Sequence, residues 1–275
     1  MSKKQQASGE SLGNVLRSMF ATSTILIALV IAFLIFKYVM GNAINFEGGN
    51  PEGQPMPGNY LGMIYKGGYI VPILISLILI LLTFSIERAV TLRRARGKGK
   101  INVFVKKLQS LLNAGQINDA IAECDKQKGS LGNVMRTGLM RYKELESDTT
   151  LEKDQKIIAL QQAFEEATAL ELPMLSKNLV ILSTIASVAV LFGLLGTVMG
   201  MIRAFAALAQ AGAPDALALA TGISEALINT AFGIGGSTVA ILLYNYFSTK
   251  IDAFTYKIDE AGFSLIQTFA ANVKK

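Results

Sequence analysis

The chain has 275 residues, of which 51% are hydrophobic and 17% are charged, and its formal net charge is +6. This balance is unusual for a soluble protein and typical of a membrane protein with several spans, in which positive charge gathers in cytoplasmic loops. There is no histidine and only one cysteine, Cys124, so the chain has no means of forming an intrachain disulfide or a His/Cys metal cluster. It also lacks the residues for a nucleophile, base and orienting group. We therefore expect no enzyme activity, no cofactor and no metal.

The N-terminal region predicts a tail, a span and a loop. Residues 1–20 are polar and basic, and residues 21–40 are apolar except for the late Lys37. A signal peptide also begins with basic residues before an apolar stretch, but the small-residue cleavage pattern is missing. We predict a cytoplasmic tail followed by a transmembrane helix. Residues 41–68 are rich in Gly, Pro and Asn and predict an irregular periplasmic loop.

A second transmembrane helix is predicted over 69–87, and it ends in the strongest orientation signal of the sequence. The basic residues that follow are Arg93, Arg94, Arg96, Lys98 and Lys100. The positive-inside rule places this end, and both termini of the chain, in the cytoplasm. Anionic lipid headgroups or nucleic acid could bind such a cluster, but topology and lipid contact account for it without nucleic acid.

Residues 88–177 predict a cytoplasmic helical domain, because apolar residues recur there at helical spacing. Its last helix, Leu151 to Leu172, is predicted to run directly into the third span, with a kink at Pro173. The remaining segments are a transmembrane helix over 178–205, a periplasmic turn over 206–218, a transmembrane helix over 219–249 and a cytoplasmic C-terminal helix over 250–275.

Small residues at helical spacing predict that the last two spans form a tight hairpin. The residues expected at these contacts are Gly193, Gly196, Gly200, Ala226, Gly233 and Ser237. The glycines of the fourth span do not form a phosphate loop, because no Lys-Ser/Thr pair follows them.

Three polar residues of this hairpin are the candidate functional residues. Glu225 lies in an otherwise uncharged run, where a charge is costly and marks a functional site by default. It could instead be a helix-start carboxylate, or pair with Arg203. Thr197 and Thr230 could simply pack helix to helix, or their hydroxyls could hold water or bond a partner's carboxylate. Since the four uncharged runs contain no aspartate, a partner is expected to supply a second titrating group.

Two motifs of this hairpin resemble the signatures of the ExbB/TolQ proteins in the MotA/TolQ/ExbB proton channel family. They are GLLGTVMGM at 193–201 followed by Ala204-Phe205, and GISEALINTAFG at 222–233 with Tyr244-Asn245 beyond it. The stretch Leu112 to Gln116, with Ala120, Cys124 and Gly138-Leu139, is similar to the family's cytoplasmic domain. The likeness covers roughly Ile70 to Lys250.

The resemblance implies an all-α inner-membrane protein whose long helices extend into a cytoplasmic domain, assembled as a homopentamer around a central pore. It implies a single-span ExbD/TolR-type partner with a membrane aspartate, and proton-driven work on a TonB/TolA-type protein across the periplasm. The family's two pore threonines and its membrane glutamate match Thr197, Thr230 and Glu225. The chain departs from the family's usual three spans by its extra N-terminal span.

The sequence is also compatible with other functions. Four spans with a cytoplasmic insert are also the arrangement of MotA, so a MotA-like stator subunit is one alternative. A non-conducting membrane scaffold is another. A secondary transporter is disfavoured, because the sequence shows no inverted repeat and no pair of broken helices.

Overall fold

A computed structural model describes residues 22–209 and 215–272, and the predicted tail over 1–20 lies outside this part. Within the described part the secondary structure is helical, without a strand, and an isolated bridge joins Phe46 to Pro55. The described part contains four helical stretches that are long and apolar enough to cross a membrane: Thr22–Met40, Ile70–Ala95, Lys153–Leu208 and Ala216–Asn272. The predicted all-α fold with four candidate spans is therefore confirmed. The chain forms two compact units, one of residues up to Ser85 with Ile181–Leu243, the other of Ile86–Val180 with the residues from Tyr244 onward.

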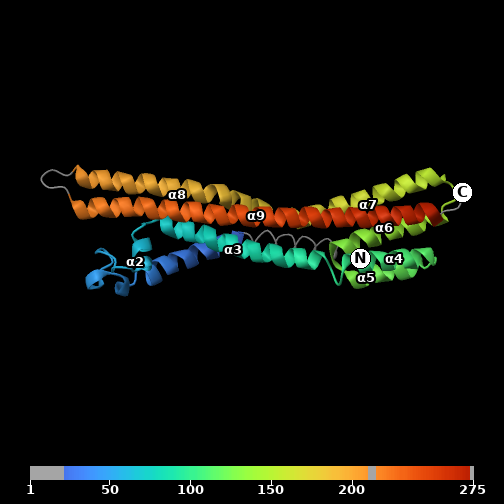
Figure 1. Cartoon of the computed structure of the whole chain (residues 1–275), viewed down its shortest axis with the longest axis horizontal. Helices are drawn as coiled ribbons and strands as arrows, with labels where there is room; N and C mark the ends of the chain where they lie inside the picture. Colours follow the sequence, from blue (N-terminus) through green and yellow to red (C-terminus); the bar gives the residue numbers. More distant parts are fainter. Residues whose placement is uncertain (1–21, 210–214, 273–275) are drawn as a thin grey trace, which may run out of the picture. The chain divides into compact units, whose positions relative to one another are not determined.

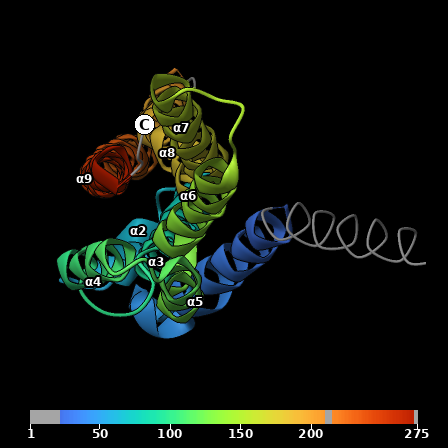
Figure 2. The same cartoon turned by 90° about the vertical axis from the view of Figure 1, so that its right-hand side faces the viewer.

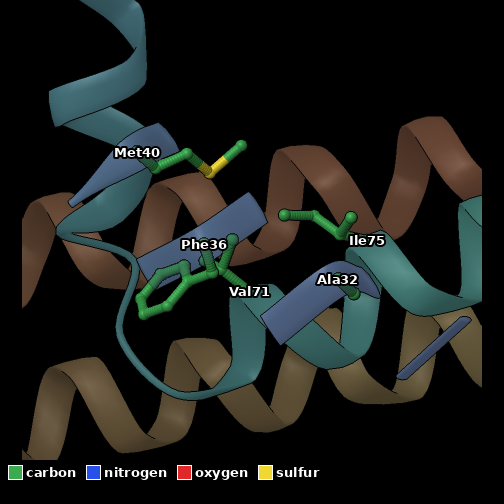
Figure 3. Close-up of a cluster of buried hydrophobic side chains, with 5 residues drawn as sticks. All are labelled: Ala32, Phe36, Met40, Val71 and Ile75. Carbon is green, nitrogen blue, oxygen red and sulfur yellow. The ribbon is translucent and has the colours of Figure 1, made fainter. Parts of the chain in front are cut away.

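The first helix packs against the start of α3 (Ile70–Ala95) in the first unit. It ends in a π-helical turn, η1 (Ile35–Met40), in which the Gly41 amide donates to the Phe36 carbonyl at 2.9 Å. Ala32, Phe36 and Met40 lie on one face and are buried against Val71 and Ile75 of α3 (Figure 3). The Phe36 ring also stacks on Tyr65, with the ring centroids 4.6 Å apart. The extra N-terminal helix is thus part of an apolar core.

The predicted loop over 41–68 is more ordered than its composition indicates. It contains the short 3-10 turns η2 (Ala43–Asn45) and η3 (Glu47–Gly49) and the helix α2 (Tyr60–Tyr65). Asn45 is 3% exposed, and its amide donates to the Val39 and Met40 carbonyls at 2.8 Å each. Asn59 donates to the Asn45 side-chain oxygen at 2.9 Å and caps α2. Apart from these short turns and α2 the segment is irregular, and buried asparagines supply the hydrogen bonds that regular secondary structure would otherwise supply.

The hairpin of α8 (Leu179–Leu208) and α9 (Ala216–Asn272) completes the first unit, and the two helices run side by side there (Figure 1). Asp215 begins α9 by accepting from the Leu217 and Ala218 amides at 3.0 Å each, a typical N-cap. α9 continues without a break to Asn272, so the predicted C-terminal helix is an extension of the fourth span.

The second unit is a helical bundle. Its helices are α4 (Ile101–Asn113), α5 (Ile117–Gln127), α6 (Gly129–Ser147) and α7 (Lys153–Ser176), joined by the later part of α9. α4 lies beside α5, and α5 beside α6 (Figures 1 and 2). Leu108, Leu139 and Leu265 are fully buried, and the Tyr142 ring meets Phe269 edge to face with centroids 4.6 Å apart. Leu108, Leu139 and Tyr142 belong to the apolar residues that recur at helical spacing in the predicted cytoplasmic domain.

A buried polar cluster marks the junction between α7 and α8. The helix leads into the third span as predicted, but the two parts are separated by a short turn: Pro173 lies inside α7, and the interruption comes later, at Lys177 and Asn178. The interruption frees carbonyls at the end of α7, and the Arg88 guanidinium donates to those of Met174 and Leu175 at 3.4 and 3.0 Å. This side-chain cap accounts for a helix end that the position of Pro173 does not predict.

Candidate functional site

The first unit holds α8 and α9 in close contact through small residues. A Cβ atom at Gly193 would lie 3.0 Å from the Gly233 Cα, and one at Gly200 would lie 2.6 Å from the Gly222 carbonyl oxygen. The Ser237 hydroxyl donates to the Ala186 carbonyl at 2.5 Å. The backbones therefore approach more closely than side chains larger than hydrogen would allow at these glycines.

Thr197 and Thr230 face each other across this contact, and their hydroxyls are hydrogen-bonded to each other. The Thr230 hydroxyl also lies 3.0 Å from the Ala226 carbonyl oxygen, and the Thr197 hydroxyl lies 3.2 Å from that of Gly193. Each hydroxyl has one proton and two lone pairs, so the pair can exchange donor and acceptor roles without leaving a proton unbonded. The site is a small adaptable polar group between two apolar helices.

Glu225 forms a separate polar group with Arg203 of α8. One Arg203 nitrogen, Nη1, lies 2.7 Å from both carboxylate oxygens, so the predicted pairing is present. The Glu225 side chain is 4% exposed, whereas that of Arg203 is 47% exposed. Gly68 has φ +73°, and a Cβ atom there would lie 2.5 Å from a Glu225 oxygen. Only glycine fits at this position, and it brings backbone directly against the carboxylate.

A cavity of about 490 Å³ adjoins this ion pair, which we call the Glu225 pocket. Its lining includes Phe36 of the first helix and three further charged residues, Glu52, Lys66 and Asp215. Burial lowers the pKa of the Lys66 ammonium, and the nearby Glu52 carboxylate opposes this effect. The extra N-terminal helix and the segment over 41–68 thus contribute walls to the pocket where Glu225 lies.

The structure also brings forward Asn229, which sequence reasoning did not select. Its side chain is fully buried, packs against Gly196, and donates to the Gly67 carbonyl at 2.8 Å. Its Oδ1 atom is buried without a hydrogen-bond partner in the described part of the chain. An amide inside an apolar span is costly, and that signal was present in the sequence.

The three predicted site residues therefore fall into two groups. Thr197 and Thr230 bond each other across the α8–α9 contact, while the hydrogen bonds of Glu225 go to Arg203. In the part of the chain that the structure describes, no group of three His, Cys, Asp or Glu residues is arranged to hold a metal ion.

The chain matches known proteins over this region. Residues 126–260 match the model of the MotA/TolQ/ExbB proton channel family. The chain is an ExbB/TolQ-type protein. It is 27% identical over 202 residues to the Tol-Pal system protein TolQ of Haemophilus influenzae, covering 71% of this chain and 86% of that protein. It is 27% identical over 172 residues to the biopolymer transport protein ExbB of Pseudomonas putida, covering 62% and 48% respectively. It is 38% identical over 96 residues to ExbB of Helicobacter pylori, covering 35% and 66%.

The ExbB/TolQ match includes all three predicted site residues. The chain spans most of the Haemophilus relative but about half of the Pseudomonas putida one. The matched residues begin within α5, so the first helix, the 41–68 segment and α3 lie outside the matched family region. The family and the names of the relatives support a proton-channel role in energy transduction by a multi-pass membrane protein.

Proposed function

We propose that the chain is an inner-membrane subunit of a proton-driven motor. In this proposal it assembles as a homopentamer around a central pore that holds an ExbD/TolR-type single-span partner. Proton flow then drives work on a TonB/TolA-type protein across the periplasm. The family match supports this proposal, as does the hydroxyl pair placed where the two spans meet.

The Thr197–Thr230 pair is the observation that carries the mechanism. A carboxylate in hydrocarbon strongly favours its neutral form, so releasing its proton there requires a hydrogen-bond donor or water. The two hydroxyls bond each other, and one of them can rotate to donate to a partner's carboxylate. They offer the ionised form a solvated setting without adding a fixed charge to the span.

The Arg203–Glu225 pair gives Glu225 a different role from that of the hydroxyls. Protonation removes the negative charge of Glu225. Its bond to Arg203 is then weaker, and the positive charge of Arg203 is left without a counter-ion. The half-exposed Arg203 side chain already lines the Glu225 pocket together with Lys66 and Glu52, so it can bind another anionic group there when Glu225 is neutral. We assign Arg203 as the counter-ion of the ionised Glu225 carboxylate.

Proton flux into proteoliposomes containing the chain and its partner tests the proposal. We expect Thr197→Val/Thr230→Val to lose flux and force-coupled activity while still binding the partner in a pull-down. The matched control is Thr238→Val, because the Thr238 hydroxyl also lies in α9 but, among the residues that the structure describes, bonds only the Ile234 carbonyl of its own helix, at 2.9 Å. We expect the Glu225→Gln variant to lose proton flux. The Arg203→Gln variant should change the dependence of proton flux on external pH.

Each alternative function has a distinct outcome. Normal force-coupled activity in the double valine variant would show that the hydroxyls only pack helices, as a scaffold requires. Purification with a MotB-type partner in place of an ExbD/TolR-type one would favour a MotA-like stator subunit.

A further inference from the structure

The second unit contains a cleft lined by cations that the proposed function does not use. Two adjoining cavities of about 380 and 480 Å³ share Arg96, Lys250 and Phe254. Arg93 also lines the first cavity, and Lys100 and Lys257 line the second. We call the two cavities together the basic cleft. It lies between the end of α3, the start of α4 and α9.

The charge of the basic cleft is uncompensated. Five cations line it, and none of its lining residues is an aspartate or a glutamate. The ion pairs within 4 Å among the described residues involve other cations, such as Lys107, Arg136 and Arg141. An anion entering the cleft would therefore meet several donors that have no competing carboxylate partner.

The backbone around Arg96 is fixed in position. The Gln127 side chain donates to the Arg96 carbonyl at 3.1 Å, and the Lys98 amide donates to the Gln127 carbonyl at 2.8 Å. Gly97 between them has φ +71°, a conformation that favours glycine. The arginine therefore extends from an anchored turn.

The walls of the cleft are apolar and aromatic. Phe247, Phe254 and Leu92 are buried there, and the Lys250 ammonium lies 5.5 Å from the centroid of the half-exposed Tyr246 ring. A free anion gains nothing from such walls, whereas an amphipathic molecule can place its hydrocarbon against them. Tyr246 is also the residue type that gathers at membrane–water interfaces.

The residues of the cleft follow the uncharged runs of two predicted spans, where lipid headgroups are expected. The uncharged run of α3 ends at Ile86, and Arg93 follows about two helical turns later. The uncharged run of α9 ends at Thr249, directly before Lys250. Arginine and lysine side chains of this length reach back toward the membrane interface. The cleft has this position relative to the spans whether it lies on the cytoplasmic or the periplasmic side of the membrane.

We propose that the basic cleft binds the phosphate headgroup of an anionic phospholipid, with the first part of an acyl chain against Phe247 and Phe254. The phosphate would lie between Arg96 and Lys250, which both cavities share. Nucleic acid fits less well, because it needs an extended track of phosphate contacts rather than two small cavities with buried aromatic walls.

Native mass spectrometry of the delipidated full-length protein, titrated with phosphatidylglycerol, tests this site. We expect saturable binding that Arg96→Gln/Lys250→Gln weakens about 30-fold, the effect of losing two cations near the surface. Arg94→Gln/Lys98→Gln is the matched control, because it removes the same charge from the same basic run outside the cleft. It should leave binding within about twofold.

Several results would overturn the proposal. Equal weakening by both double variants would mean a diffuse surface charge, and equal binding of zwitterionic phosphatidylcholine would mean no headgroup selectivity. Displacement by millimolar inorganic phosphate would assign the site to free phosphate. Tighter binding of an oligonucleotide than of the lipid would assign it to nucleic acid. Should the first variant misfold by circular dichroism, Lys100→Gln/Lys257→Gln replaces it, with the same expectation.

Discussion

At the residue scale, Arg88 is a buried cation whose donors are divided between a carboxylate and a helix end. Its side chain is 3% exposed, and Nε donates to Glu87 at 2.6 Å while Nη1 donates to the Leu175 carbonyl at 3.0 Å. Glu87 also accepts from Thr91 and Asn178, at 2.9 and 3.1 Å. One side chain thus links the end of α3 to the junction of α7 with α8.

Replacing Arg88 should be among the most destabilising single changes in the second unit. We expect Arg88→Gln to lower the free energy of unfolding by about 3 kcal/mol, because it leaves Glu87 without its counter-ion and the α7 carbonyls without their donor. This value is at the low end of the range for breaking a buried ion pair, because the Glu87 side chain is 26% exposed. Chemical denaturation in detergent, followed by circular dichroism, measures it.

Glu87→Gln/Arg88→Gln should lose less than the sum of the two single changes, because no charge is then left unpaired. Arg94→Gln, at an exposed arginine of the same helix, is the control and should change little. A loss as small for Arg88→Gln as for Arg94→Gln would rule out the capping role.

Cys124 is a thiol that the fold keeps unreactive. Burial raises its pKa to about 12, and the neighbouring Asp125 carboxylate acts in the same direction. Because the thiolate is the reactive form, we expect maleimide to label the folded chain very slowly at pH 8 and the unfolded chain readily. Labelling should accelerate only as pH approaches the raised pKa.

The sign of the linked effect on stability follows from the same shift. Above the ordinary thiol pKa of about 8.5 the unfolded chain loses this proton while the folded chain keeps it, so Cys124 lowers stability as pH rises toward 12. Cys124→Ala should remove this alkaline dependence. Equal labelling rates of folded and unfolded chains at pH 8 would contradict the buried position.

At the element scale, the closeness of α8 to α9 depends on which glycines face the partner helix. Gly200 lies against Gly222 and Ala226, whereas a Cβ atom at Gly235 would have no described residue within 4 Å. Both glycines lie in helix interiors, so the two positions differ mainly in packing. They form a matched pair for testing the hairpin.

Gly200→Ala should destabilise the hairpin by about 1–3 kcal/mol, because the added methyl collides with backbone that has no room to move aside. Gly235→Ala should instead be neutral or stabilising by up to about 1 kcal/mol, since alanine favours helix. Thermal unfolding in detergent measures both, with native mass spectrometry to count subunits. Destabilisation by Gly235→Ala alone would show that this glycine, not Gly200, lies at a helix contact.

Elements that depend on neighbouring residues can be predicted from the sequence, whereas features that depend on contacts between distant residues cannot. The four spans follow from the length of uncharged runs, a local property, and Arg203 lies near enough to the end of its span for its pairing with Glu225 to be anticipated. The bond from Asn229 to the Gly67 carbonyl joins residues 162 positions apart, and no local pattern announces it. The interruption at Lys177 likewise depends on Arg88, 86 and 87 residues from the carbonyls that it caps.

At the scale of the whole molecule, charge is distributed unevenly along the chain. The segment over 41–68 has Lys66 as its one basic residue, whereas Arg93, Arg94, Arg96, Lys98 and Lys100 follow the second span. Since basic residues are retained in the cytoplasm, this asymmetry predicts that the 41–68 segment is periplasmic and that both termini are cytoplasmic. In this predicted topology the extra first helix turns the N-terminus to the cytoplasmic side.

Single-cysteine labelling with a membrane-impermeant maleimide tests this topology, and the buried Cys124 gives it a low background. Met56→Cys is the periplasmic probe, because Met56 is 46% exposed in the 41–68 segment. It should be labelled in intact spheroplasts, while Ser2→Cys and Ala271→Cys should react only after the membrane is opened.

Protection of Met56→Cys in intact spheroplasts would contradict the periplasmic position of the 41–68 segment and invert the predicted topology. Labelling of Ser2→Cys from outside, with Ala271→Cys still protected, would mean that the first helix does not cross the membrane. The chain would then have three spans, and the first helix would be a periplasmic wall of the Glu225 pocket.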